Sequence, residues 1–219
     1  MTINTELKQY IDSTILPKYI DNIGGHDLDH IKTVVQRSFE IVKAFQLDVN
    51  PNMVYTIAAF HDIGYKMDPD NHEQISAELF LQEENLKKFF SQEEIKIMSE
   101  AIVDHRASLE YEARSIYGKL VSSADREISV DNMLERSLKY QKDKHATENP
   151  TLDQVIAFSY KKLSSKYGKG GYAKMYYPDQ KYQDYLSEMQ TLLENFALFS
   201  CIEQKIAEKI NLFPLTQKK

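Results

Sequence analysis

The sequence has one cysteine, seven glycines among 219 residues and no tryptophan. The lone Cys201 excludes a disulfide within the chain, so a reducing compartment is expected and the predicted location is the cytoplasm. Cys201 lies among Leu198, Phe199 and Ile202, which predicts a buried and unreactive thiol. The first ten residues lack the apolar core of a signal peptide, and no apolar run is long enough to cross a bilayer. We therefore expect no association with a membrane.

A surplus of basic residues is also missing. The chain has 27 lysines and arginines against 33 acidic residues, which gives a net charge of -6. Binding to a nucleic-acid polymer requires a cationic surface, so such polymers are not expected partners. A small phosphorylated ligand is compatible with this charge, because a bound metal ion supplies positive charge locally. The sequence does not indicate an oligomeric state.

Signals for helices fill nearly the whole chain and predict an all-α fold. Asp27 is expected to cap one helix and Pro51 to begin another, while Asn71 with Gln74, and Ser91 with Glu94, have the spacing of capping boxes. The pair Gly24-Gly25 is expected to separate the first two helices. Helices are predicted over residues 5–20, 27–45, 51–64, 72–84, 92–106, 115–127, 130–146, 151–166 and 179–211. We expect them to form a single all-α domain over residues 1–219.

Histidine and aspartate gather in the middle of the chain, where five of the six histidines fall between residues 26 and 105. Imidazole and carboxylate together suit a borderline divalent ion such as Mn, Fe, Co or Zn. The long spacings mean that side chains from separate helices would have to converge on such an ion. The candidate residues are His26, His30, His61, Asp62, His72, His105 and Asp125.

Two of these carboxylates are expected to be buried. Asp62 ends an apolar helix just before Gly64, and Asp125 follows a run of small residues. Burying a carboxylate without a partner is costly, and a metal ion or a histidine would satisfy it. The structural alternative is an ion pair with Arg126 or Lys66.

The pattern His…His-Asp…Asp formed by His30, His61, Asp62 and Asp125 resembles the HD superfamily of metal-dependent phosphohydrolases over residues 20–130. The strings GHDLDH, HDIGY, HEQISA and ADR are similar to those of small stand-alone bacterial HD proteins. Some of those proteins split nucleoside triphosphates into a monophosphate and pyrophosphate. The resemblance implies an all-α helical bundle with the metal in a cleft between helices, and leaves residues 131–211 as a C-terminal helical extension.

The resemblance also implies roles for individual residues. His30, His61, Asp62 and Asp125 would bind one ion, with Asp62 also orienting the attacking water as the catalytic residue. His72 and His105 match positions at which two-metal members bind a second ion and one-metal members contact substrate phosphate. We expect the one-ion arrangement, with these two histidines on the substrate side. Mn, Fe, Co or Ni is the expected cofactor, because Mg rarely accepts nitrogen ligands.

Several features leave alternatives open. His26 either touches the site or satisfies the start of a helix. Four cations are candidates for binding substrate phosphate, with a surface charge or salt bridge as the alternative for each: Arg37, Lys66, Arg106 and Arg126. The basic tract 166–174 is interpreted as a linker between helices rather than a lid over the substrate.

The expected function is metal-dependent hydrolysis of a phosphoester or phosphoanhydride bond in a small substrate, in the first place a nucleotide. HDIGY stands where the HD phosphodiesterases of cyclic dinucleotides carry HDIGK, and no GYP string occurs, which argues against that branch. The alternatives are a di-iron oxygenase of the HD type and a non-catalytic HD protein that binds a metal or ligand.

Overall fold

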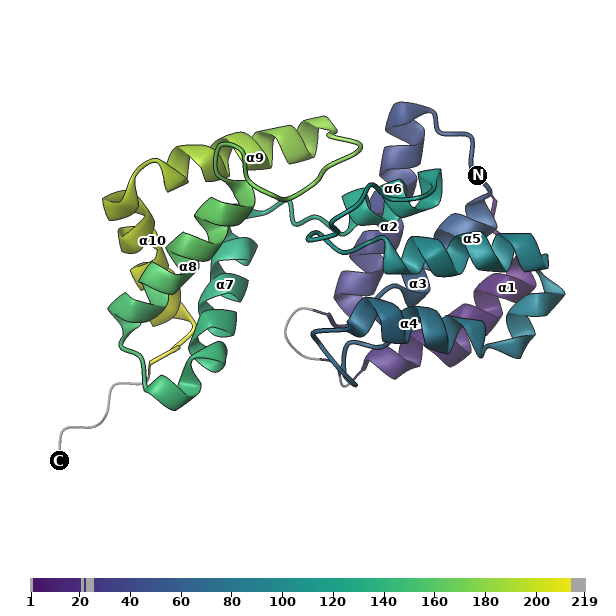
Figure 1. Cartoon of the computed structure of the whole chain (residues 1–219), viewed down its shortest axis with the longest axis horizontal. Coiled ribbons are helices and arrows are strands. Elements are labelled where there is room, and N and C mark those ends of the chain that lie inside the picture. The colour runs from purple at the N-terminus through teal and green to yellow at the C-terminus, as the bar shows by residue number, and fades with distance from the viewer. Residues whose placement is uncertain (1, 21, 23–25, 214–219) are drawn as a thin grey trace. The chain divides into compact units, whose positions relative to one another are not determined.

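The structure is a computed structural model that describes residues 2–20, 22 and 26–213. Over these residues the chain forms helices and no strand, so the predicted all-α fold is confirmed (Figure 1). None of the described helices is both long and apolar enough to span a bilayer. The predicted break at Gly24-Gly25 lies outside the described residues.

The helices pack as two compact units, one comprising residues up to Arg126 together with Lys174–Asp179, and the other Glu127–Ala173 with the chain from Gln180 onward. The boundary after Arg126 is close to the end of the HD-like core expected from the sequence. Folding as one cooperative domain stays a prediction.

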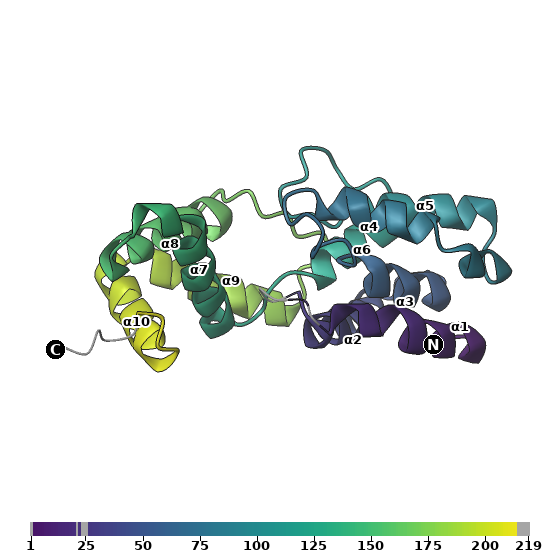
Figure 2. The same cartoon turned by 90° about the horizontal axis from the view of Figure 1, so that it is seen from below.

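The first unit is built around α3 (Pro51–Phe60), which packs against four other α-helices. All eight residues from Met53 to Phe60 are buried, because the helix is apolar around its whole circumference. In Figures 1 and 2, α4 and α5 lie side by side in this unit. The other elements are α1 (Thr5–Tyr10), the π-helical turn η1 (Ile11–Ile15), η2 (Leu16–Tyr19), α2 (Leu28–Phe45), α4 (His72–Leu81), η3 (Glu84–Lys88), α5 (Gln92–Val103) and α6 (Ile116–Ala124).

Local capping explains most helix starts in this unit. The Asp27 side chain accepts a hydrogen bond from the His30 N–H, and Ser91 forms the predicted capping box with Glu94. Pro51 begins α3, as predicted. The capping box predicted at Asn71 is wrong, since its side chain makes no capping hydrogen bond.

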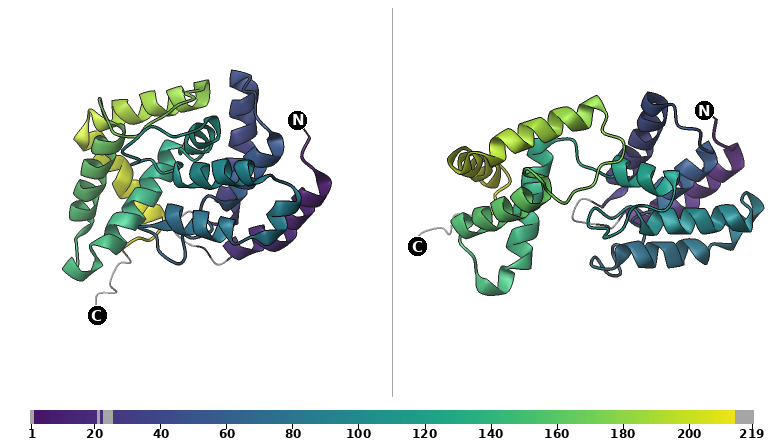
Figure 3. Two further views of the ribbon diagram at one scale, coloured as in Figure 1. Left: turned by 45° about the vertical axis from the view of Figure 1, so that its right-hand side comes forward. Right: turned by 45° about the horizontal axis from the view of Figure 1, so that its top comes forward.

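The second unit consists of α7 (Val130–Lys144), η4 (Ala146–Glu148), α8 (Leu152–Tyr167), α9 (Gln180–Leu193) and α10 (Phe196–Lys209), seen from further sides in Figure 3. The prediction of a single helix over 179–211 is wrong, because the helix is interrupted before Asn195, whose side chain caps the start of α10. The buried face of α10 carries Phe199, Glu203 and Ala207. Cys201 lies on another face and is exposed, so the prediction of a buried thiol is also wrong.

Candidate metal centre

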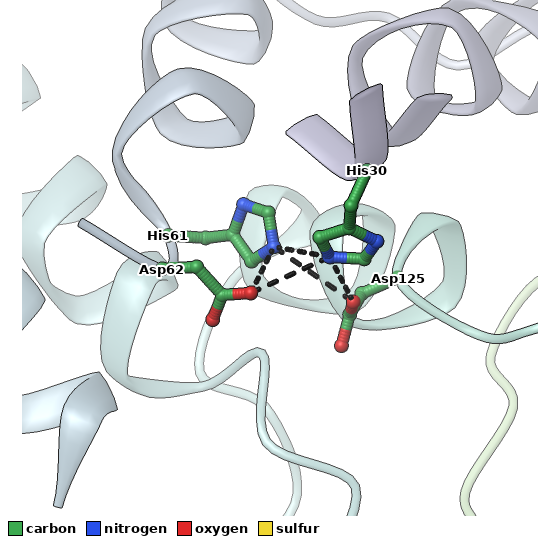
Figure 4. Close-up of side chains that lie close together, drawn as sticks. All are labelled: His30, His61, Asp62 and Asp125. Atoms are coloured by element: carbon green, nitrogen blue, oxygen red, sulfur yellow. Dashed lines mark hydrogen bonds and ion pairs between the residues drawn. The ribbon is translucent and has the colours of Figure 1, made fainter. Parts of the chain in front are cut away.

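Helix ends bring the predicted residues together in the first unit. His30 lies in the first turn of α2, and His61 and Asp62 directly follow α3. Asp125 is the residue at which α6 ends, and Figure 4 shows its side chain facing the other three. A residue just beyond a helix end can point its side chain along the helix axis, which lets several helices meet at one point.

These four residues form a first ligand group. His30 Nε2 lies 3.3 Å from His61 Nε2 and 3.2 Å from Asp125 Oδ1. His61 Nε2 lies 3.2 Å from Asp62 Oδ2. One potential ligand atom from each residue falls within 4.8 Å of all the others (Figure 4). The four side chains therefore converge as a set of metal ligands must, although their role as ligands stays a prediction.

A second group shares Asp62 with the first. His72 begins α4, and His105 lies just after α5. Their Nε2 atoms are each 3.4 Å from Asp62 Oδ1 and 3.2 Å from one another. Asp62, with 1% of its side chain exposed, thus offers Oδ2 to one group and Oδ1 to the other.

Hydrogen bonds fix the orientation of three of the imidazoles. In His61, His72 and His105, Nδ1 lies 2.8, 2.8 and 2.5 Å from the backbone carbonyl three residues earlier. A carbonyl only accepts, so each Nδ1 must carry the proton, which leaves the Nε2 lone pair of a neutral ring directed into the cluster. Such outer hydrogen bonds are the usual support of a histidine that binds a metal.

The donor set fits a divalent ion. Asp62 Oδ1 is buried and has no hydrogen-bond partner among the described residues, while two Nε2 lone pairs face it. Acceptors placed together without a donor repel one another unless a cation or protons lie between them. Imidazole nitrogen with carboxylate oxygen is a ligand combination that favours Mn, Fe, Co, Ni or Zn over Mg.

Electrostatics in the metal-free cluster agree with this view. Burial alone would raise the pKa of Asp62, but the charges of His61 and His26 hold it well below its usual range. Burial opposes the charged form of His30, yet its hydrogen bonds with Asp125 and Asp62 raise the pKa of that imidazole. Without a metal, protons on His30 and His61 balance the buried carboxylates.

His26 also contacts the cluster. Its Nδ1 lies 2.5 Å from Asp62 Oδ2, and its ring stacks on Tyr65 with the ring centres 3.7 Å apart. The geometry therefore favours the interpretation in which His26 touches the site over the one in which it only satisfies the start of a helix. The only signal in the sequence was its position one helical turn before His30.

The four candidate phosphate-binding cations differ in their surroundings. Arg37 is buried and forms a two-pronged ion pair with Asp179 at 2.8 and 3.0 Å, and Arg106 pairs with Glu73 at 2.7 Å. Both arrangements favour the salt-bridge alternative. Arg126 is buried beside Asp125, and Lys66 is exposed.

The basic tract 166–174 continues from the end of α8. The backbone N–H groups of Tyr172 and Ala173 donate to the carbonyls of Ser165 and Lys166, at 3.2 and 3.1 Å. Gly170 has a φ of +76°, a conformation that glycine adopts without strain. These bonds fold the tract back on the helix, as expected for a linker.

Comparison with known proteins agrees with the geometry. Residues 27–128 match the family model described as HD domain. No curated protein and no solved structure matches the chain. The matched segment holds every residue of both ligand groups, and the match supports a relation of this segment to the HD superfamily.

Proposed function

We propose that the protein is a metal-dependent hydrolase that cleaves a phosphoester or phosphoanhydride bond in a small substrate, with nucleotides as the first class to test. The observation that carries this proposal is the position of Asp62, whose two carboxylate oxygens each face a separate set of imidazoles. The match of residues 27–128 to the HD domain supports metal-dependent phosphohydrolase activity in general.

We further propose that the second group holds a second ion. The sequence favoured a single ion, with His72 and His105 facing substrate phosphate. The geometry favours the other alternative, because both Nε2 atoms face the unpartnered Asp62 Oδ1 rather than diverging from it.

A bound ion and Asp62 would have different roles in the reaction. A divalent ion, when bound, makes water more acidic and stabilises negative charge on phosphoryl oxygens. Asp62 lies between the two groups, where it can orient the attacking water toward phosphorus. Hydrolysis then forms a bond from the water oxygen to phosphorus and breaks the bond to the leaving oxygen. Since Arg37 and Arg106 are paired with carboxylates, most of the phosphate charge would be offset by the ions.

A release assay tests the proposal. Protein stripped of metal is loaded with Mn, Co, Ni or Mg and incubated with a panel of nucleotides, and phosphate and pyrophosphate are measured. We expect release with at least one transition metal and none from the Asp62→Asn variant. No release with any metal across mono-, di- and triphosphates would contradict the proposal.

The second ligand group also supports the alternative function, a di-iron oxygenase of the HD type. An oxygenase of the HD type needs two metals, and the two ligand groups would hold them. Oxygen consumption by the iron-loaded protein, without phosphate release, would favour that activity over hydrolysis.

A further inference from the structure

A short segment outside the family match belongs to the unit that carries the ligand groups. We call Lys174–Asp179 the strap. The chain leaves the first unit after Arg126, forms much of the second unit, and returns to the first through the strap. The HD match ends at residue 128, so this part of the first unit is not included in it.

The strap is hydrogen-bonded to α6 two residues before Asp125. The backbone N–H groups of Tyr176 and Tyr177 both donate to Ser123 Oγ, each at 3.2 Å. The Ala113 N–H donates to the Tyr176 hydroxyl at 3.0 Å. The strap therefore contacts both α6 and the loop that precedes it.

Arg126 connects the strap to both ligand groups. Its side chain is buried, with only 3% exposed, and its Nε donates to the carbonyl of Lys174 at 3.3 Å. Its Nη2 donates to the carbonyl of His105 at 3.2 Å and to Ser122 Oγ at 2.8 Å. Its Nη1 lies 3.4 Å from Asp125 Oδ2. One guanidinium thus touches a residue from each group and the first residue of the strap.

The Lys174 side chain makes a second connection. Its Nζ donates to the carbonyls of Leu109 and Tyr111, at 2.7 and 2.8 Å. Both carbonyls lie in the loop that begins at His105 and leads to α6. An ammonium group that binds two carbonyls holds that loop closed, and a charged donor makes such bonds stronger than neutral ones.

We propose that Lys174 is a positioning residue for the metal centre, which fixes His105 through the loop carbonyls and supports Arg126 beside Asp125. It touches neither ligand side chain and acts through the backbone and through Arg126. The inference rests on the proposed function only in taking His105 and Asp125 to be metal ligands. Outer supports of this kind typically change metal affinity by about 10- to 100-fold when they are removed.

Cobalt retention tests the inference without any use of activity. Purified full-length protein is loaded with Co(II), and the rate at which a chelator extracts the metal is measured beside the visible spectrum and the melting temperature. Lys174→Met should be extracted about 10- to 100-fold faster than wild type, with an altered spectrum. Lys169→Met is the matched control, because Lys169 lies in the same tract and pairs with Glu194, which belongs to the second unit. It should behave as wild type.

A second variant separates positioning from general stabilisation. Asp179→Asn removes the ion pair between Asp179 and Arg37 at the other end of the strap. It should lower the melting temperature as much as Lys174→Met does, or more, and leave cobalt extraction within about twofold of wild type.

Three outcomes overturn the inference. The first is extraction from Lys174→Met at the wild-type rate. The second is equal acceleration in both strap variants in proportion to their loss of melting temperature. The third is a wild-type protein that takes up no cobalt, which would also overturn the proposed function. A protein that binds cobalt but hydrolyses nothing would contradict the proposed function alone, and the extraction rates would still decide the role of Lys174.

Discussion

Glu203 gives the second unit a stability that depends on pH. Its side chain is fully buried on α10, where it accepts a hydrogen bond from Ser159 Oγ on α8 at 2.6 Å. Ser159 Oγ lies in turn 2.7 Å from Ser137 Oγ on α7. The other carboxyl oxygen, Oε2, has no hydrogen-bond partner in the part of the chain that the structure describes. Burial raises the pKa of Glu203 from 4.5 to about 8, and the Ser159 hydrogen bond opposes this only in part.

The sign and size of the effect follow from linkage. The folded state holds the proton more tightly than the unfolded state, so the stabilisation is complete below pH 4.5 and is lost as the pH rises through 8. At about 1.4 kcal/mol for each pKa unit, the loss is roughly 1 kcal/mol at pH 5 and roughly 4 kcal/mol at pH 8. These are upper values, because water entry or a small helix shift would relieve part of the cost.

Replacing Glu203 with glutamine should remove most of this dependence. Urea unfolding, with hydrogen exchange of α10 amides as a local measure, should show Glu203→Gln within about 1 kcal/mol of wild type at pH 5 and several kcal/mol more stable at pH 8. Glu208→Gln, an exposed change on the same helix, is the control and should follow wild type at both values. An equal difference between Glu203→Gln and wild type at the two pH values would refute the reasoning.

Three further predictions concern the metal centre. Asp62→Asn keeps the shape of the side chain but removes its charge, so cobalt affinity should fall about a hundredfold or more while the helical circular-dichroism spectrum is retained; affinity near that of wild type would contradict the shared carboxylate. Cobalt affinity should rise as the pH is raised above 6.5, because His30 and His61, whose pKa values are raised from 6.5 although burial opposes this, must lose protons to bind; a flat profile in titration calorimetry would count against them as ligands. His72→Ala or His105→Ala should each lower the metal content from two ions per chain to one, and an unchanged content would return these histidines to the substrate side.

Much of the fold followed from local patterns in the sequence. The start of α2 was set by the Asp27 side chain, and that of α5 by Ser91 with Glu94. Each of these signals acts within one helical turn, so it can be read without knowledge of the rest of the fold. The convergence of His30 with Asp125 followed only from the resemblance to the HD superfamily.

Features that depend on distant partners were not predictable in this way. Arg37 is two turns along α2 from His30, which suggested a role in the site, but it pairs with Asp179, 142 positions away. The apolar spacing that runs through residues 179–211 continues across the break between α9 and α10, so periodicity alone gave one helix. Phe196 lies at this apolar spacing and yet is 48% exposed, whereas Glu203 takes a core position.

The metal content of the wild-type protein tests the central claim most directly. Protein loaded with excess Co(II) or Mn(II) and freed of unbound ions is analysed by elemental mass spectrometry against protein concentration. Two ligand groups that share Asp62 predict two ions per chain, both lost in the combined His30→Ala and His72→Ala variant. Retention of one ion would contradict the second site, and retention of none would contradict the metal centre itself.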